Sequence, residues 1–513
     1  MPSEPEGRLD EFVELAHFEL HAESIRRLSR DFCERHRLVV LGRIPEAAGG
    51  EPVVVGMLRP GDAAATEVVA SALGRPVRAV RLHQHEIDAA REVGYPEPRP
   101  PRRRGRIRLR PIARVSYQPD REARDLVHEA IAQAITLRAS DVHFECYERD
   151  VDVRLRIDGV LRQVSTPISR QHVPAAISYL KVLAGLDIAE RRRAQDGRIV
   201  VLFDAADGET REVELRLSVV PGPHGEDAVM RILGSSLPEL GFEALGFDVA
   251  TAERFGEIVA SPEGLVLVCG PTGCGKSTTL YAALRRVNHD GNKVLTVEDP
   301  IEYELPKANQ RQVGPAMGFA DYARAFLRQD PDVLMIGEIR DEETASLAAR
   351  AAQTGHLVLS TLHTRDAVGA VPRLQTLGLD DAMIADVLLG VLAQRLVRRI
   401  CPQCSEPQEP DPLLLRRLRL AALDFAVRRG RGCDACHGEG YRGRIGIYEL
   451  FAPDAEIAHR IAAGAAPQRI REAARERGLR TLLDDALDKL RSGATTLEEV
   501  ARSVPYALER GGA

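Results

Sequence analysis

The chain divides into three segments that differ in the spacing of their apolar residues. In the first, apolar runs at 38–41 and 53–58 alternate with helical patterns near 62–73 and 84–93. Short apolar runs between helical patterns are typical of strands. We therefore predict a small α/β domain over residues 1–95.

A stretch rich in proline and arginine follows, over residues 96–119. Proline favours an extended backbone and clustered arginines keep the chain solvated, so we interpret this stretch as a linker. A contact of these arginines with nucleic acid or anionic lipid is the alternative. The linker is favoured because charge that is interrupted by proline is usually a spacer.

The second segment, residues 120–235, begins with a helical pattern at 125–138 and continues with strand patterns. In 151–158 and 212–219, alternation places apolar residues on one face and charged residues, Arg216 among them, on the other. We predict an α+β domain whose sheet buries one face. For the charged face, an ordinary solvated surface is the default interpretation.

The third segment, residues 236–513, alternates apolar runs with helical patterns, which indicates a mostly parallel sheet. The runs lie at 265–269, 293–297, 333–336 and 357–362. Unbroken apolar runs are typical of strands buried on both faces, and each run here ends in polar residues. Helices are predicted within the last part, 448–513, at 466–476, 480–491 and 496–502.

Charge and hydropathy exclude some classes of function. The 513 residues include 70 Lys or Arg and 76 Asp or Glu, and a net charge of -6 lacks the basic character of a dedicated nucleic-acid binder. The best candidate for a membrane span, Met383–Val397, is interrupted by Asp386, Gln394 and Arg395, so we expect none. The acidic amino terminus lacks the features of a signal peptide, and we expect a cytoplasmic protein.

A complete phosphate-binding loop stands between the run at 265–269 and a helical pattern from Thr278. Its residues are Gly270, Pro271, Thr272, Gly273, Cys274, Gly275, Lys276 and Ser277. In such a loop backbone N–H groups surround phosphate oxygens, the lysine reaches the terminal phosphates and the serine hydroxyl ligates Mg²⁺. With a strand before it and a helix after it, a chance match is negligible, and the chain is predicted to bind a nucleoside triphosphate.

Hydrolysis needs carboxylates beside that loop, to hold the metal and to orient water. Two strand ends supply Glu298, Asp299, Glu302 and Glu338. A further run is flanked by His356 and His363. A histidine at a strand end is by default a structural hydrogen-bonding group, but beside a phosphate site it can sense the terminal phosphate.

Two CxxC pairs lie in the stretch 396–447, at Cys401 and Cys404 and at Cys433 and Cys436. Four thiolates at this spacing suit a closed, tetrahedral Zn²⁺ site of the structural kind. Four unrelated buried cysteines are the alternative, and the spacing favours zinc.

Together and in this order, the motifs resemble those of the ATPase family that powers type II secretion and type IV pilus assembly. The resemblance covers about residues 120–505. It rests on the phosphate loop at 270–277, an aspartate box at 297–303, a stretch at 327–341, a histidine box at 352–364, and the paired CxxC with 440–449.

The resemblance implies a RecA-like P-loop motor domain in a hexameric ring, with the nucleotide between the second domain and the motor domain. It implies that Glu298 is the general base and that Glu338 is the Walker B carboxylate. His356 and His363 are then the histidine-box residues near the terminal phosphate.

The family's arginine fingers, which act on a neighbouring chain, are implied to be Arg198, Arg216 and Arg231. Guanidinium groups suit this task because a transferring phosphoryl group needs its charge neutralised. Cys274 departs from the serine usual in the family. Since this position contributes mainly its backbone N–H, we expect ATP binding to persist, with some sensitivity to thiol reagents. We find no Arg-Leu-Gly-type repeats of the kind that bind cyclic dinucleotide in some relatives.

We therefore predict a cytoplasmic, hexameric ATPase that uses ATP, Mg²⁺ and Zn²⁺ and drives pseudopilus assembly in a type II secretion system. Its N-terminal domain is expected to dock on a platform protein of the inner membrane, with no nucleic-acid partner. A type IV pilus extension motor is the alternative. A P-loop nucleic-acid motor fits less well, because aromatic residues make up 4% of the chain and Trp is absent. A module that binds nucleotide without turnover fits less well because the carboxylate set is complete.

Overall fold

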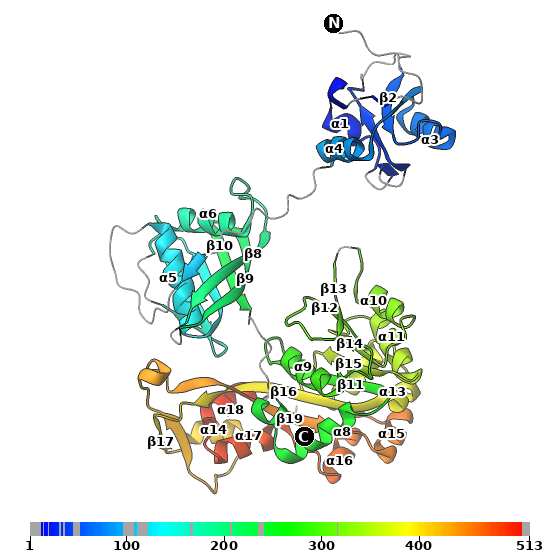
Figure 1. Cartoon of the computed structure of the whole chain (residues 1–513). Coiled ribbons are helices and arrows are strands. Elements are labelled where there is room, and N and C mark those ends of the chain that lie inside the picture. Colours follow the sequence, from blue (N-terminus) through cyan, green and yellow to red (C-terminus); the bar gives the residue numbers. More distant parts are fainter. Residues whose placement is uncertain are drawn as a thin grey trace. The chain divides into compact units, whose positions relative to one another are not determined.

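The structure, a computed structural model, describes residues 12–504 apart from 14, 19, 30–31, 34–35, 45–51, 96–106, 110–121, 165–167, 206–207, 234–240 and 315. The chain forms two compact units, Met1–Gly105 and Arg106–Ala513 (Figure 1). The predicted linker lies outside the described residues except for Ile107–Leu109, which forms strand β4. Within the described ranges, no helix has the length and apolar character needed to cross a membrane.

The amino-terminal unit is built on a three-stranded sheet in the order β1-β2-β3. Its main elements are α1 (Ala22–Ile25), β1 (Leu38–Leu41), β2 (Val53–Met57), α3 (Ala63–Leu73), β3 (Val77–Arg81) and α4 (Gln84–Gly94). β1 and β2 pair antiparallel, and β2 and β3 pair in parallel through α3. The carboxylate of Asp62 caps the start of α3, and Gly74 ends it in the left-handed conformation, so local sequence fixes both ends of the connecting helix.

The second lobe, Ile107–Leu233, contains a seven-stranded sheet in the order β4-β8-β9-β10-β5-β6-β7. Its elements are α5 (Ala123–Thr136), β5 (Ala139–Cys146), β6 (Val151–Ile157), β7 (Val160–Gln163), α6 (Val173–Ala184), β8 (Gln195–Asp204), β9 (Thr210–Gly222) and β10 (Gly225–Leu233). Both helices pack on the sheet around a core that includes Phe144, Leu155 and Leu217 (Figure 1). The alternation read from the sequence thus buries one face of β6 and β9 and leaves their charged residues on the other.

The motor lobe, Phe242–Ser503, contains a second seven-stranded sheet in the order β13-β12-β14-β15-β11-β16-β19. Its strands are β11 (Gly264–Cys269), β12 (Val294–Glu298), β13 (Asn309–Gln312), β14 (Val333–Ile336), β15 (Leu357–Leu362), β16 (Leu388–Ile400) and β19 (Tyr441–Phe451). β12, β14, β15 and β11 pair in parallel, as the four apolar runs predicted. α8 (Val249–Val259) precedes the first strand, and the helices between the strands include α9 (Lys276–Val287), α10 (Phe319–Phe326), α11 (Glu342–Gln353), α12 (Ala370–Thr376) and α13 (Asp381–Val387).

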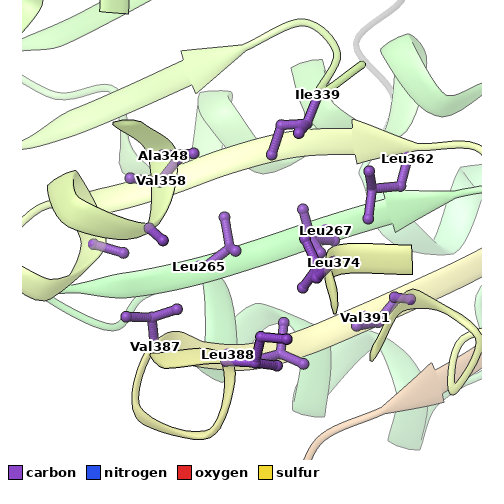
Figure 2. Close-up of a cluster of buried hydrophobic side chains, with 14 of the residues drawn as sticks. Leu265, Leu267, Ile339, Ala348, Val358, Leu362, Leu374, Val387, Leu388 and Val391 are labelled. Carbon is purple, nitrogen blue, oxygen red and sulfur yellow. The ribbon is translucent and has the colours of Figure 1, made fainter. Parts of the chain in front are cut away.

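Both faces of this sheet are buried. Figure 2 shows Leu265 and Leu267 of β11 among side chains that come from β15, α11 and β16. The alternate residues, Val266 and Val268, pack on the opposite face with Leu280 of α9. One strand therefore contributes to two apolar cores, which is why its sequence has no polar alternation.

Hydrophobic periodicity did not reveal β16. β16 takes up most of the apolar stretch 383–397, in which polar residues argued against a membrane span. α13 ends at Val387, and β16 begins at the next residue. A helix and a strand that share one apolar run cannot be separated by periodicity alone. Gln394 and Arg395, which interrupt the run, are only 1% and 8% exposed.

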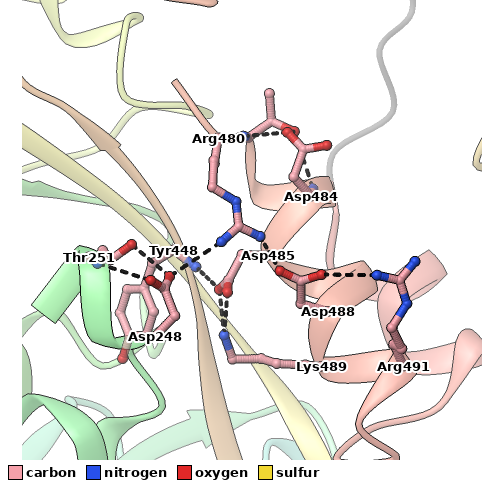
Figure 3. A network of polar contacts seen from close by, with 10 residues as sticks. Asp248, Thr251, Tyr448, Arg480, Asp484, Asp485, Asp488, Lys489 and Arg491 are labelled. Atoms are coloured by element: carbon pink, nitrogen blue, oxygen red, sulfur yellow. Dashed lines mark hydrogen bonds and ion pairs between the residues drawn. The ribbon is translucent and has the colours of Figure 1, made fainter. Parts of the chain in front are cut away.

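Beyond the motor sheet, β17 (Ser405–Gln408) and β18 (Val427–Gly430) form a small two-stranded antiparallel sheet, and the chain closes with helices. These are α15 (Ala455–Ala462), α16 (Pro467–Glu476), α17 (Leu482–Arg491) and α18 (Leu497–Ser503). A buried ion pair lies within α17, where Asp485 contacts Lys489 at 2.5 Å (Figure 3). Asp485 also joins α17 to β19, because it accepts the N–H of Tyr448 at 2.8 Å. Burial raises the pKa of Asp485, although Lys489 opposes this.

Candidate functional site

The phosphate loop joins the carboxyl end of β11 to the first residue of α9. Gly273 and Gly275 have φ angles of 76° and 90°, which glycine adopts at little cost. Nζ of Lys276 donates to the carbonyls of Gly270 and Pro271 at 3.0 and 3.1 Å. The loop therefore presents a helix N-terminus with a lysine beside it, an arrangement that suits phosphate groups.

Gln394 of β16 holds the loop from behind. Its Nε2 donates to the carbonyl of Cys274 at 2.6 Å, and its Oε1 accepts the hydroxyl hydrogen of Thr279 at 2.8 Å. Gln394 and Thr279 are each 1% exposed, so water does not compete for these bonds. Sequence reasoning missed this residue. Its signal was a polar side chain inside an apolar run.

Arg395, the next residue, is also buried behind the loop. Its guanidinium donates to the carbonyls of Gln394 and Arg365 at 2.9 and 2.7 Å, and burial lowers its pKa. Cys274 lies in the same region, and burial raises the pKa of its thiol. A buried thiol with a raised pKa is a weak nucleophile, so the expected sensitivity to thiol reagents does not fit this position.

Glu298 ends β12 and is 4% exposed. Its Oε1 accepts hydrogen bonds from Thr296 at 2.6 Å and from Gln310 at 3.1 Å, and its Oε2 accepts one from Tyr281. The carboxylate is thus buried at the edge of the sheet and held at both oxygens.

Glu338 follows β14, the strand next to β12. One of its carboxylate oxygens lies 3.0 Å from Nε2 of His363, and the other lies 2.8 Å from the guanidinium of Arg340. His363 follows the carboxyl end of β15, so two neighbouring strands, β14 and β15, bring these groups together. The sequence analysis had not singled out Arg340, because a charged residue after a strand is usually solvated.

The structure does not bring His356 to this edge, which corrects the pairing of the two histidines read from the sequence. His356 precedes β15, whereas His363 follows it, and a six-residue strand separates its ends by about 20 Å. Nδ1 of His356 lies 2.9 Å from the carbonyl of Ala351 and 3.2 Å from the Thr354 hydroxyl. His356 is therefore placed as a structural hydrogen-bonding group.

Three arginines stand side by side across the polar face of the second-lobe sheet. The register places Arg216 of β9 directly opposite Arg198 of β8 on one side and opposite Arg231 of β10 on the other. Among the described residues, Arg216 has no ion pair, and its buried Nε has no hydrogen-bond partner. Burial, followed by the Arg198 charge, lowers the pKa of Arg216. Like charges placed opposite each other are destabilising, so the row favours an anion beside it.

Asp141 continues this row on β5 and holds two arginines. Its carboxylate lies 3.1 Å from Arg231 and 3.6 Å from Arg156 of β6. Arg156 and Asp141 were not among the residues predicted from the sequence. The register between neighbouring strands would have placed Asp141 and Arg156 in the same row as the three arginines.

A cleft of about 1040 Å³ lies between the second lobe and the motor lobe. It is lined by Asp141, Arg156 and Arg231 from the second lobe and by Thr272, Gly273, Gly275, Lys276, Ser277, Thr278, Glu298, Glu338 and His363 from the motor lobe. The N–H of Gly443 donates to Asp158 across it at 2.8 Å. The resemblance implied arginines that act on a neighbouring chain. Here Arg156 and Arg231 face the cleft of their own chain, with Arg216 and Arg198 farther along the row.

The four cysteines of the CxxC pairs meet in one cluster. Their sulfur atoms all lie within 4.8 Å of one another, which fits a tetrahedral metal site. The backbone N–H groups of Cys433 and Gly440 each donate to Sγ of Cys436 at 3.2 Å. Although burial opposes ionisation, these bonds help to lower the pKa of Cys436 to about 7. The donor set suits Zn²⁺, because N–H groups directed at sulfur stabilise the thiolate that the metal requires.

Comparisons with known proteins match most of the chain. Residues 118–502 match the family described as "Type II/IV secretion system protein", and residues 11–99 match the MshEN domain. The type IV pilus assembly ATPase PilB of Thermus thermophilus is 48% identical over 74% of this chain and 43% of its own length. The type II secretion system ATPase E of Vibrio cholerae is 45% identical over 74% of each chain.

Solved structures are similar over about three quarters of the chain. The pilus retraction motor PilT with bound ADP has a TM-score of 0.50 and 27% identity, covering 75% of this chain and 98% of its own. The ATPase DotB of Legionella pneumophila has a TM-score of 0.55 at 22% identity, covering 75% of this chain and 96% of its own, which supports the fold.

Purified protein should contain about one Zn²⁺ per chain, because four thiolates close one tetrahedral site. Cys401→Ser and Cys436→Ser should lose the metal, as measured by elemental analysis. Cys146→Ser is the matched control and should retain it, since Cys146 lies on β5 of the second lobe. Protein prepared without chelators that contains no zinc would contradict this assignment.

Gln394→Glu should weaken nucleotide binding by about fivefold to 150-fold. The change replaces the donor to the Cys274 carbonyl with an oxygen that repels it, and an unmet buried polar group costs about 1–3 kcal/mol. Titration with a fluorescent nucleotide measures the affinity. The exposed Gln353→Glu is the control for the added charge, and equal affinity of the two variants would contradict the role given to Gln394.

Proposed function

The chain belongs to the type II/IV secretion system protein family, and from this premise we propose that it hydrolyses ATP in the cleft between its second and motor lobes to drive pseudopilus assembly in a type II secretion system. The family membership predicted from the sequence is confirmed, as are the α/β multidomain fold with a RecA-like core and the class of enzyme, an ATPase. The roles of single residues, the machine served and its partners are the proposal.

The observation that carries the proposal is that a lysine, a helix N-terminus, a serine hydroxyl and carboxylates lie together at one edge of the motor sheet. Lys276 and the N-terminus of α9 suit the phosphates, and the Ser277 hydroxyl with nearby carboxylate oxygens suits Mg²⁺. Glu298 would take the proton of the attacking water, and Glu338 would hold the metal's water shell. The bound Mg²⁺ would neutralise charge on the transferring phosphoryl group.

The choice of a secretion system over a pilus rests on the extent of the matches. The Vibrio cholerae secretion ATPase is matched over 74% of its length, whereas the chain spans 43% of the Thermus thermophilus pilus ATPase. A type IV pilus extension motor remains the second candidate because identity to that protein is 48%. In either machine we propose a hexamer at the cytoplasmic face of the inner membrane, docked on a platform protein through the amino-terminal unit that matches the MshEN domain.

Lys276→Ala should abolish tight nucleotide binding, whereas Glu298→Gln should retain binding and stop turnover. The lysine contacts phosphate in the ground state, while a general base acts only in the transition state, where it contributes roughly 10²–10⁴-fold. Nucleotide titration and steady-state phosphate release separate the two effects. Lys307→Ala, an exposed lysine of the same lobe, should behave as wild type in both assays. Near wild-type hydrolysis by Glu298→Gln would move the base to another carboxylate.

Arg216→Ala should lower turnover by about 10³-fold or more and leave nucleotide binding intact, because guanidinium groups act on charge that develops in the transition state. If the arginine row serves its own chain, mixed assemblies of Arg216→Ala and Glu298→Gln chains recover no activity. Recovery in mixtures that co-assemble would show instead that the arginines act on a neighbouring chain. Arg211→Ala, at the exposed start of β9, is the control.

A further inference from the structure

The carboxylate of Glu298 is surrounded by hydrogen-bond donors from three elements. Thr296 lies two residues earlier on β12, Tyr281 comes from α9, and Gln310 comes from the edge strand β13. A carboxylate has about four lone-pair sites, so three donors leave about one site for a further donor such as water. The three side chains therefore fix the direction in which Glu298 can accept a proton.

The hydroxyl of Tyr281 carries one hydrogen, and it has two acceptors within reach. These are the Glu298 carboxylate and the carbonyl of Tyr303 at 3.0 Å. The charged oxygen is the stronger acceptor, so the hydrogen belongs to Glu298. Burial, and then the contact with Glu298, raise the pKa of Tyr281, so the hydroxyl stays protonated and remains a donor.

The amide of Gln310 has only one consistent orientation. Its Oε1 accepts the backbone N–H of Leu305 at 2.7 Å, so its Nε2 must face Glu298 at 3.1 Å. The same Nε2 donates to the Tyr303 carbonyl at 2.9 Å. Gln310 thus ties the loop after the aspartate box to the carboxylate at the end of β12.

We propose that Tyr281, Thr296 and Gln310 are positioning residues that aim the Glu298 carboxylate at the attacking water, and so set the rate of hydrolysis rather than the affinity for nucleotide. The proposal rests on the proposed function, in which Glu298 is the general base. Its basis is the accounting of donors and acceptors above, in which Thr296, Tyr281 and Gln310 each direct a hydrogen at the Glu298 carboxylate. None of the three side chains needs to touch the nucleotide.

Two single variants each remove one donor with little change of shape. Tyr281→Phe deletes the hydroxyl, and Gln310→Glu keeps an acceptor for the Leu305 N–H but places an oxygen against Glu298. Each should lower kcat by about tenfold to a hundredfold, the range expected for misplacement of a catalytic group, with KM and the affinity for a fluorescent ADP analogue unchanged within about twofold. Asn309→Asp adds the same charge on β13 as Gln310→Glu, from an exposed side chain of the opposite face, and should keep the wild-type kcat.

A double variant separates positioning from stabilisation. Gln310→Glu should cause no further loss when added to Glu298→Gln, because a positioning residue has no effect once the group it positions is gone. Three results would each overturn the proposal: wild-type kcat in both single variants, additive losses in the double variant, or a joint fall of kcat, affinity and melting temperature. A wild-type chain that binds ATP but does not hydrolyse it would instead overturn the proposed function, and the proposal with it.

Discussion

The site depends on the parallel pairing of four strands that are buried on both faces. Parallel strands direct all their carboxyl ends to one edge of a sheet, so β11, β12, β14 and β15 deliver the phosphate loop, Glu298, Glu338 and His363 to a single place. The apolar cores above and below the sheet hold this alignment without any contact between the groups themselves. The same rule removes His356, which precedes its strand and therefore belongs to the opposite edge.

This alignment places polar groups where water does not reach, and each must find a partner inside the protein. Gln394 meets the loop carbonyl of Cys274 and the Thr279 hydroxyl, while Arg395 meets two further carbonyls. The bonds of Gln394 oppose any movement of the loop against β16. Glycine gives the phosphate loop its shape but not its rigidity, so rigidity has to come from side chains behind it.

Much of this could be predicted from the sequence, because the signals were local. The phosphate loop, the four buried strands and the CxxC pairs are each encoded within a few neighbouring residues. Gln310, Gln394 and Arg340 could not be found this way, since each becomes important only through a partner on another element. β16 was missed for a related reason: its apolar run continues from a helix, and only pairing with β11 and β19 shows where the strand begins.

β16 also connects the two chemically distinct parts of the motor lobe. Gln394 holds the phosphate loop, and the strand continues to Ile400, next to the first cysteine of the cluster, so the two sites are about 23 Å apart along one strand. At that distance a metal has no direct effect on phosphate chemistry. It can, however, fix the far end of β16 and β19, whose antiparallel pairing runs from the cysteine cluster back to the motor core. A metal held by four thiolates, with no ligand position left open, is suited to that mechanical task and to no catalytic one.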